Sequence, residues 1–276
     1  MKRKTLILLC LLSFCFHAGC SKTTEDKEEQ IHDYGVFLSY EGDLTELSDY
    51  KTIVIDAQYI SKDDILNFKA KEHTVYSYIN IGSLENFRDY YDTFKDVTLG
   101  AYEHWEEEFW IDVSDQHWQD FILNDLAQAL IDKGIDGFFV DNCDVYYQYR
   151  NAEIFDGLTT IMKGLKSTGK DVIINGGDSF LNTYCNTIGK WSDIVTGINQ
   201  ESVFSSINWD DNSFGTASNE DHEYFTEYIE SYGNQGADIF LLEYTTDIEL
   251  INEIKNYCHK NNYRFYISDE LQLDVK

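Results

Sequence analysis

Short runs of apolar residues recur along the chain from residue 35 onward, and stripes of apolar residues with helical spacing separate most of them. The runs are nearly continuous rather than alternating, which is typical of parallel strands covered on both faces. We expect strands at 35–38, 52–56, 74–82, within 133–144, and at 171–175, 193–201, 238–244 and 264–268. A short additional strand is expected at 110–113, after an irregular acidic and aromatic segment at 83–109.

The stripes between these runs predict helices. The expected helices are 61–68, 115–130, 154–165, 224–232 and 250–258, with a short helix near 180 and a polar loop at 208–222. Ser61 is a typical N-cap residue, and acidic residues follow it in the first turn. Regular alternation of strand and helix favours a parallel α/β fold over separate α and β blocks.

Residues 34–276 are long enough for one (β/α)8 barrel, and no internal repeat or Gly/Ser linker divides them. We therefore predict an α/β protein with a single TIM barrel over this range. A doubly wound open sheet is the alternative. No glycine-rich phosphate loop follows the first strand, which argues against that alternative.

Polar side chains stand where the predicted strands end. They are Asp56, Asn80, Asp141, Asn142, Asn175, Glu201, Glu243 and Tyr244. In a barrel the carboxyl ends of all strands meet at one rim, and the active site lies there. For Asp141 and Asn142 the alternative is an Asx-type turn at a strand exit. Acidic residues at the ends of several different strands favour a site.

Cleavage of a glycosidic bond needs two carboxyl groups beside the bond, one ionised and one able to donate a proton. The predicted rim supplies acids for this task, together with amides that can bind sugar hydroxyls. Aromatic residues make up 15% of the chain, and aromatic faces stack on sugar rings. Tyr146, Tyr147 and Tyr244 are favoured to face a substrate, with Tyr78 and Asp144 as further candidates, although core packing is the usual role of a single aromatic residue.

No cofactor is expected. The seven histidines show neither HxH nor HExxH spacing, which disfavours a catalytic metal. The sequence has no GxSxG motif, and Cys143 has acidic neighbours that would raise the pKa of its thiol and disfavour it as a nucleophile.

Residues 1–20 have the pattern of a targeting segment, with a basic start and an apolar stretch too short to span a bilayer. His-Ala-Gly-Cys, ending at Cys20, resembles the lipobox of bacterial lipoproteins. We expect cleavage before Cys20, lipidation of its sulfur and a polar tether at 21–33. The expected location is the bacterial cell envelope, in the outer membrane, on its periplasmic face or at the cell surface. An ordinary signal peptide is the alternative.

The chain carries 21 basic and 50 acidic residues, a net charge of −29, and loss of the three basic residues of the leader would make it −32. This charge disfavours nucleic acid and anionic lipid as partners, so we expect membrane contact through the lipid alone. A neutral or cationic substrate fits better, although most of these carboxylates are expected to be ordinary solvated surface groups. We expect a monomer.

Several stretches together resemble successive motifs of glycoside hydrolase family 114, the endo-α-1,4-polygalactosaminidases and related barrel proteins. They are YINIGSLENFR (78–88), WIDV (110–113), KGIDGFFVDNCD (133–144), NQE (199–201) and LEY (242–244). The first and third are specific as a pair, and the resemblance spans residues 34–270. The expected first strand departs from the family, because it lacks a tryptophan and a glutamine, and Cys143 stands where an aliphatic residue is usual.

The resemblance implies a (β/α)8 fold and hydrolysis of α-1,4-linked galactosamine polymers by two carboxylates. By position it makes Asp141 the nucleophile and Glu201 the general acid/base. It also implies that Arg88, Asp112, Glu243 and Tyr244 shape the sugar subsites. A deacetylated galactosamine polymer is cationic, and a strongly acidic protein would attract it.

We therefore predict an exported, lipid-anchored glycoside hydrolase that cleaves an α-1,4-linked, galactosamine-type polysaccharide with Asp141 and Glu201. The predicted substrate-binding residues are Asp56, Tyr78, Asn80, Arg88, Asp112, Asn142, Asp144, Tyr146, Asn175, Glu243 and Tyr244. A non-catalytic carbohydrate-binding lipoprotein and another class of hydrolase on the same barrel are the alternatives. The separation of the two carboxyls distinguishes them, since catalysis requires about 5–5.5 Å for retention or about 6.5–9.5 Å for inversion.

Overall fold

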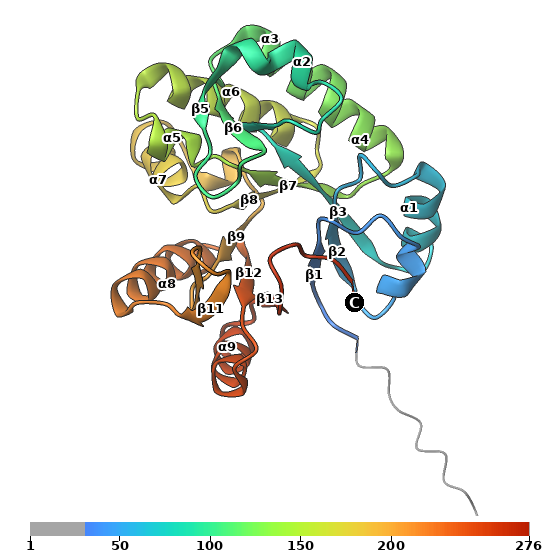
Figure 1. Ribbon diagram of the computed structural model, residues 1–276, viewed down its shortest axis with the longest axis vertical. Helices are drawn as coiled ribbons and strands as arrows, with labels where there is room; N and C mark the ends of the chain where they lie inside the picture. The colour runs from blue at the N-terminus through green and yellow to red at the C-terminus, as the bar shows by residue number, and fades with distance from the viewer. Residues whose placement is uncertain (1–30, 276) are drawn as a thin grey trace, which may run out of the picture. The chain divides into compact units, whose positions relative to one another are not determined.

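Eight parallel strands form the centre of the fold in a computed structural model that describes residues 31–275 (Figure 1). The predicted leader with Cys20, and the predicted tether up to residue 30, lie outside the described residues. The strands follow one another around the sheet in chain order: β1 (Gly35–Phe37), β2 (Thr52–Ile55), β3 (Thr74–Asn80), β7 (Gly137–Asp141), β8 (Asp171–Asn175), β9 (Gly197–Glu201), β12 (Asp238–Tyr244) and β13 (Arg264–Ser268). This order is that of a (β/α)8 barrel, because a doubly wound sheet reverses its strand order at a switch point.

The barrel is nearly closed. Parallel ladders join each strand to the next from β1 to β13. The first and last strands approach each other through aromatic side chains, with the ring centroids of Phe37 and Tyr266 5.2 Å apart. Residues before 34 also take part in the fold, because His32 forms an isolated bridge with Tyr50.

Helices cover the outside of the barrel (Figure 1). They are α1 (Lys62–Lys69), α3 (Gln116–Asp120), a π-helical turn (Phe121–Leu126) that continues into α4 (Ala127–Lys133), α5 (Val145–Gln148), α6 (Ala152–Ser167), α7 (Asp178–Thr187), α8 (Asn219–Gly233) and α9 (Ile248–Asn261). Helix α1 begins as predicted, with the hydroxyl of Ser61 accepting a hydrogen bond from the Asp64 amide at 3.2 Å. Helix α4 ends at Gly134, whose φ of 100° is readily adopted only by glycine.

Apolar side chains pack in two layers that follow the alternation of the strands. Phe138 and Val140 of β7 point outward and join the large core between barrel and helices. Phe139 points inward and joins a smaller cluster with residues of other strands, including Val54 and Phe240. The interior of the barrel is therefore filled with side chains, as expected for eight strands.

Two insertions stand at the carboxyl ends of the strands. Between β3 and β7 an antiparallel sheet of β4 (Ser83–Glu85), β6 (Glu108–Ile111) and β5 (Thr98–Ala101) accompanies the short helix α2 (Tyr91–Phe94). After β9 a hairpin forms from β10 (Ser205–Asn208) and β11 (Ser213–Thr216). The prediction of a loop at 208–222 was wrong, because the hairpin extends to residue 216 and α8 starts at 219. Its strands are mostly serine, asparagine and threonine, so they show no apolar alternation.

Three further observations concern residues 31–275 only. None of their helices combines the length and hydropathy needed to cross a membrane. Cys143, Cys185 and Cys258 are free thiols. No group of three or more histidine, cysteine, aspartate or glutamate side chains has an arrangement that could hold a metal ion.

Candidate active site

Alternation along the strands decides which strand-end side chains face the axis of the barrel. Residues two positions apart on a strand point the same way. The side chains of the smaller cluster point into the barrel, so the side chains two positions later on the same strands point inward as well. This places Asp56, Asn80, Asp141 and Asn175 toward the axis, and Tyr244 belongs to the inner cluster itself.

Asn175 holds the two predicted catalytic carboxyls close together. Its amide nitrogen donates one hydrogen bond to Asp141 Oδ1 at 2.9 Å and another to Glu201 Oε1 at 2.7 Å. Because the two oxygens share this nitrogen, they lie at most about 5.6 Å apart, an upper limit that fits the separation of about 5–5.5 Å in retaining glycosidases better than the about 6.5–9.5 Å in inverting ones. The hydroxyl of Tyr244 donates to the second oxygen of Glu201 at 2.9 Å.

The amide of Asn175 is itself fixed from inside the barrel. Its oxygen accepts a hydrogen bond from Asn199 Nδ2 at 2.7 Å, and the oxygen of Asn199 accepts one from the Tyr34 hydroxyl at 3.2 Å. With the oxygen of Asn175 engaged in this way, both of its N–H groups are directed at the carboxyls. The separation of Asp141 and Glu201 is therefore set by a chain of polar groups rooted in the barrel core.

Burial raises the pKa of both carboxyls. For Asp141 the pKa is raised to about 6, first by burial and then by the negative charge of Glu201. For Glu201 burial raises the pKa, and the hydrogen bonds from Asn175 and Tyr244 oppose this because they favour the ionised form. Two such neighbours resist losing both protons, so the pair retains one proton in mildly acidic solution.

A cavity of about 670 Å³ lies over the pair. Nine acidic residues line it: Glu41, Asp56, Glu85, Glu107, Glu108, Asp141, Asp144, Asp178 and Glu201. Within the described part of the chain, Arg88 is the one basic residue of the lining. Aromatic residues also line the cavity, among them Tyr59, Phe87, Tyr102, Trp105, Trp209 and Phe225. The cavity therefore offers rings for sugar stacking and a strongly negative potential that favours cations.

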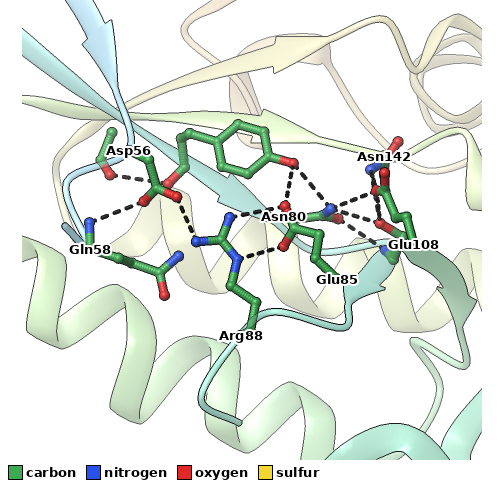
Figure 2. Close-up of polar contacts among 10 residues, drawn as sticks. Asp56, Gln58, Asn80, Glu85, Arg88, Glu108 and Asn142 are labelled. Atoms are coloured by element: carbon green, nitrogen blue, oxygen red, sulfur yellow. Dashed lines mark hydrogen bonds and ion pairs between the residues drawn. The ribbon is translucent and has the colours of Figure 1, made fainter. Parts of the chain in front are cut away.

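Arg88 is enclosed by two carboxylates (Figure 2). Its Nε and Nη2 donate to the two oxygens of Glu85 at 2.7 and 2.9 Å, and its Nη1 donates to Asp56 at 2.5 Å. The side chain of Arg88 is only 3% exposed. Two charges thus compensate one guanidinium, so Arg88 forms part of the cavity wall and leaves no free positive charge for an anion.

Asn80 and Asn142 both face Glu108, a residue that the sequence analysis did not single out (Figure 2). Glu108 Oε1 accepts hydrogen bonds from Asn80 Nδ2 at 2.9 Å and Asn142 Nδ2 at 2.8 Å, and a short one from the Ser83 hydroxyl. Gly82 allows this approach, because a Cβ there would lie 1.7 Å from the carbonyl oxygen of Asn142. Burial raises the pKa of Glu108 to about 7.

Tyr102 was also missed by the sequence analysis. Its ring stacks on Trp110 with centroids 4.2 Å apart, and its side chain lines the cavity. Burial, followed by the charges of Asp141 and Glu108, raises the pKa of its hydroxyl. Asp144, which was predicted, lines the cavity near them, and burial followed by the charge of Asp178 raises its pKa to about 7.

Not every predicted residue lines the cavity. Asp112 Oδ1 accepts hydrogen bonds from the amide and hydroxyl of Ser114, at 3.0 and 2.6 Å, and so shapes the turn before α3. Tyr146 is 8% exposed and packs on Phe155, with ring centroids 5.4 Å apart. Tyr147 is 68% exposed and also lies outside the lining. None of the three side chains lines the cavity, which differs from the subsite role predicted for Asp112 and Tyr146 and from the substrate-facing position expected of Tyr147.

Glu243 is completely buried and points away from the barrel axis. Its carboxylate accepts hydrogen bonds from the backbone amides of Val203, Phe204 and Ser205 at 2.9–3.2 Å, and from the Ser205 hydroxyl at 2.6 Å. It therefore fixes the segment that directly follows Glu201. This position differs from the predicted subsite role, because Tyr244 and its neighbour Glu243 cannot both face the axis.

Comparisons with known proteins identify a family and several similar folds. The sequence matches the model of glycoside-hydrolase family GH114 over residues 21–271. No curated protein matches the chain. Among solved structures, the glycoside hydrolase domain of PelA from Pseudomonas aeruginosa is 16% identical, with a TM-score of 0.71 over 88% of this chain and 96% of that chain.

Two other solved structures have a similar fold. Ega3 from Aspergillus fumigatus, in complex with galactosamine, is 17% identical, with a TM-score of 0.69 over 93% of this chain and 98% of that chain. An alpha-galactosidase from Thermus thermophilus is 8% identical, with a TM-score of 0.56 over 89% of this chain and 59% of that chain. These likenesses confirm the TIM-barrel fold, and the family match covers nearly the whole sequence. The chain therefore belongs to glycoside hydrolase family GH114 and is a glycoside hydrolase.

Proposed function

We propose that the protein cleaves an amino-sugar polysaccharide by a retaining mechanism in which Asp141 is the nucleophile and Glu201 the general acid/base. The observation that carries the proposal is the amide of Asn175, which bonds both carboxyls and keeps their nearest oxygens within about 5.6 Å. A separation this short favours direct attack by one carboxylate, because an inverting enzyme needs space for a water molecule at the sugar.

The proposed reaction has two steps. Asp141 attacks the anomeric carbon while Glu201 donates its proton to the leaving oxygen, so a glycosyl ester forms and the glycosidic bond breaks. Glu201, now ionised, then takes a proton from the water that attacks the ester and releases Asp141. The hydroxyl of Tyr244 is placed to stabilise Glu201 while it is ionised, because hydrogen bonds to a charged acceptor are strong.

The charge of the cavity supports a cationic substrate. Its lining carries nine acidic groups, and the guanidinium of Arg88 is already paired with Asp56 and Glu85. The Ega3 structure is a complex with galactosamine, a sugar that carries an amine. We therefore propose an α-1,4-linked, galactosamine-type polysaccharide as substrate.

Release of reducing ends from a panel of polymers tests this proposal. We expect cleavage of a galactosamine polymer, and little cleavage of a neutral polymer of the same length. NMR of the first product should show the anomer with the configuration of the cleaved bond, and the opposite anomer would contradict retention. Binding by the wild-type protein without any cleavage would support a non-catalytic carbohydrate-binding protein instead.

The kcat/KM for cleavage should fall at high pH, when the pair of Asp141 and Glu201 loses its last proton. Both steps need one proton on the two carboxyls, and burial, followed by the negative charge of Glu201, raises the pKa of Asp141 to about 6. Above that pH the pair loses its last proton, so kcat/KM should fall by roughly tenfold per pH unit. Initial rates between pH 4 and pH 8 check this expectation, and a constant kcat/KM up to pH 8 would contradict it.

We also propose that the protein is exported and anchored to the bacterial envelope by lipid on Cys20. The support is the leader-like pattern of residues 1–20, which lie outside the described residues. Replacing Cys20 with serine should move the protein from the membrane fraction to the soluble fraction, because stable anchoring depends on acyl chains. Fractionation with labelled palmitate measures this, and unchanged membrane association of the variant would refute the anchor.

A further inference from the structure

The two carboxylate oxygens of Glu108 differ in their contacts with residues 31–275. Oε1 accepts hydrogen bonds from Asn80, Asn142 and Ser83, which belong to β3, the exit of β7 and β4. Oε2 has no hydrogen-bond partner among residues 31–275, and the side chain lines the cavity. Three donors on one oxygen orient this carboxyl firmly, and the orientation leaves the second oxygen open to a ligand.

Within residues 31–275, no positive charge is free to pair with Glu108. Arg88 is the one basic lining residue of the described chain, and Asp56 and Glu85 already bind it. Burial, followed by the negative charges of Asp141 and Glu85, raises the pKa of Glu108 to about 7. A cation beside Oε2 would favour the ionised form, so the missing charge is one that a ligand can supply.

The position of Glu108 relative to Asp141 and Glu201 indicates which part of a bound sugar it would contact. Asn142, which bonds Glu108, directly follows Asp141 in the chain. The ring of Tyr102 lies near both acids, and its hydroxyl has no partner among residues 31–275. A sugar whose anomeric carbon meets Asp141 would therefore have its neighbouring substituent within reach of Glu108.

We propose that Glu108 is a specificity-determining residue that binds the free ammonium group of the sugar seated against Asp141. It thereby selects an unsubstituted amine over an acetamido group or a hydroxyl. This inference rests on the proposed function. An acetamido group has no charge and one N–H, so it would leave a buried carboxylate without a cation, and such unmatched polar groups give strong discrimination.

The variant Glu108→Gln tests the proposal. The carbonyl of glutamine can accept the same three hydrogen bonds, while its NH2 group would face the ammonium in place of an acceptor. We expect kcat/KM on a galactosamine polymer to fall by about 100-fold, and the preference over the N-acetylated polymer to fall by a similar factor. Glu106→Gln is the matched control, because Glu106 is an exposed glutamate of the same segment that does not line the cavity, and we expect its effect to stay within about threefold.

Equal effects of the two variants, or an unchanged amine preference in Glu108→Gln, would overturn the inference. Failure of the wild-type protein to cleave the polymer would overturn the proposed function instead. In that case calorimetric binding of galactosamine and N-acetylgalactosamine oligosaccharides to wild type and Glu108→Gln decides the inference separately. Thermal unfolding accompanies each measurement. If Glu108→Gln unfolds, Glu108→Asp, which keeps the charge but withdraws it from the cavity, should show the same loss of preference.

Discussion

Replacing Asp141 with asparagine is expected to lower kcat by roughly 10⁴-fold, because the variant cannot form the glycosyl ester. The size and shape of the side chain are unchanged, and the oxygen of the new amide can still accept the hydrogen bond from Asn175. Substrate binding should therefore persist, and KM should change much less than kcat. Reducing-end release, together with calorimetric binding of an oligosaccharide, separates these two quantities.

The role of each carboxyl can be distinguished with two controls. Glu201→Gln should retain the first step on an aryl glycoside whose leaving group needs no proton, whereas Asp141→Asn should not. Azide added to Asp141→Ala should occupy the vacated space and give a glycosyl azide of inverted configuration. Azide products from the Glu201 variant alone, with inverted configuration, would reverse the assignment.

Stability provides an independent check on Asp141→Asn. The folded protein keeps one proton on the pair of Asp141 and Glu201 up to a pH of about 6, whereas an exposed aspartate loses its proton near pH 4. The folded state therefore binds more protons between these values, and the contribution of Asp141 to stability declines as the pH rises through this window. At pH 8 the variant should thus be at least as stable as the wild type, with any change within about 1–2 kcal/mol. A strongly destabilised variant would indicate a structural role.

Replacing Glu243 with leucine is expected to lower the free energy of unfolding by about 3–5 kcal/mol. The change leaves the amides of Val203, Phe204 and Ser205 buried without their acceptor, together with the Ser205 hydroxyl. The segment they belong to follows Glu201 directly, so kcat should also fall in the molecules that remain folded. Chemical denaturation and initial rates measure the two effects.

Ser205→Ala is the matched control for Glu243→Leu. It removes the hydroxyl that donates to Glu243 and accepts from the amide of Tyr244, and it leaves the three backbone donors satisfied. We expect it to cost about 1–2 kcal/mol, well below the cost of losing the carboxylate. A loss in Glu243→Leu no larger than that of the control would show that the backbone amides find other acceptors.

The sequence was sufficient to predict the barrel because most of its strands are mainly apolar runs that end at a polar residue. Asp141, Asn175 and Glu201 were predicted to lie on one rim, and the structure brings them together around a single amide nitrogen. The alternation of side chains along a strand would also have separated Tyr244 from Glu243. Both follow the apolar run of β12, but only one of two consecutive residues can face the axis.

The remaining features depend on contacts that no local pattern encodes. Glu108 is the last of three consecutive glutamates, and its distinction from Glu107 comes from Asn80, Ser83 and Asn142, which lie far away in the sequence. Tyr102 faces the pair because the antiparallel sheet of β4, β5 and β6 folds back over the barrel. Asp112 was assigned to a sugar subsite by resemblance to the family, yet its carboxylate accepts hydrogen bonds from Ser114, two residues away.

The amide that joins the two carboxyls also bears on how the enzyme ages. Asn175 is followed by Gly176, and asparagine before glycine is the dipeptide most prone to deamidation, in which the glycine nitrogen attacks the side-chain carbonyl. In the fold, that nitrogen donates to the backbone oxygen of Asn199 at 2.9 Å, and the side chain of Asn175 is held at both ends. Conversion to aspartate would place a third carboxylate against Asp141 and Glu201. The same contacts that space the reacting groups thus hold the Gly176 nitrogen and the Asn175 side chain away from the geometry that deamidation needs.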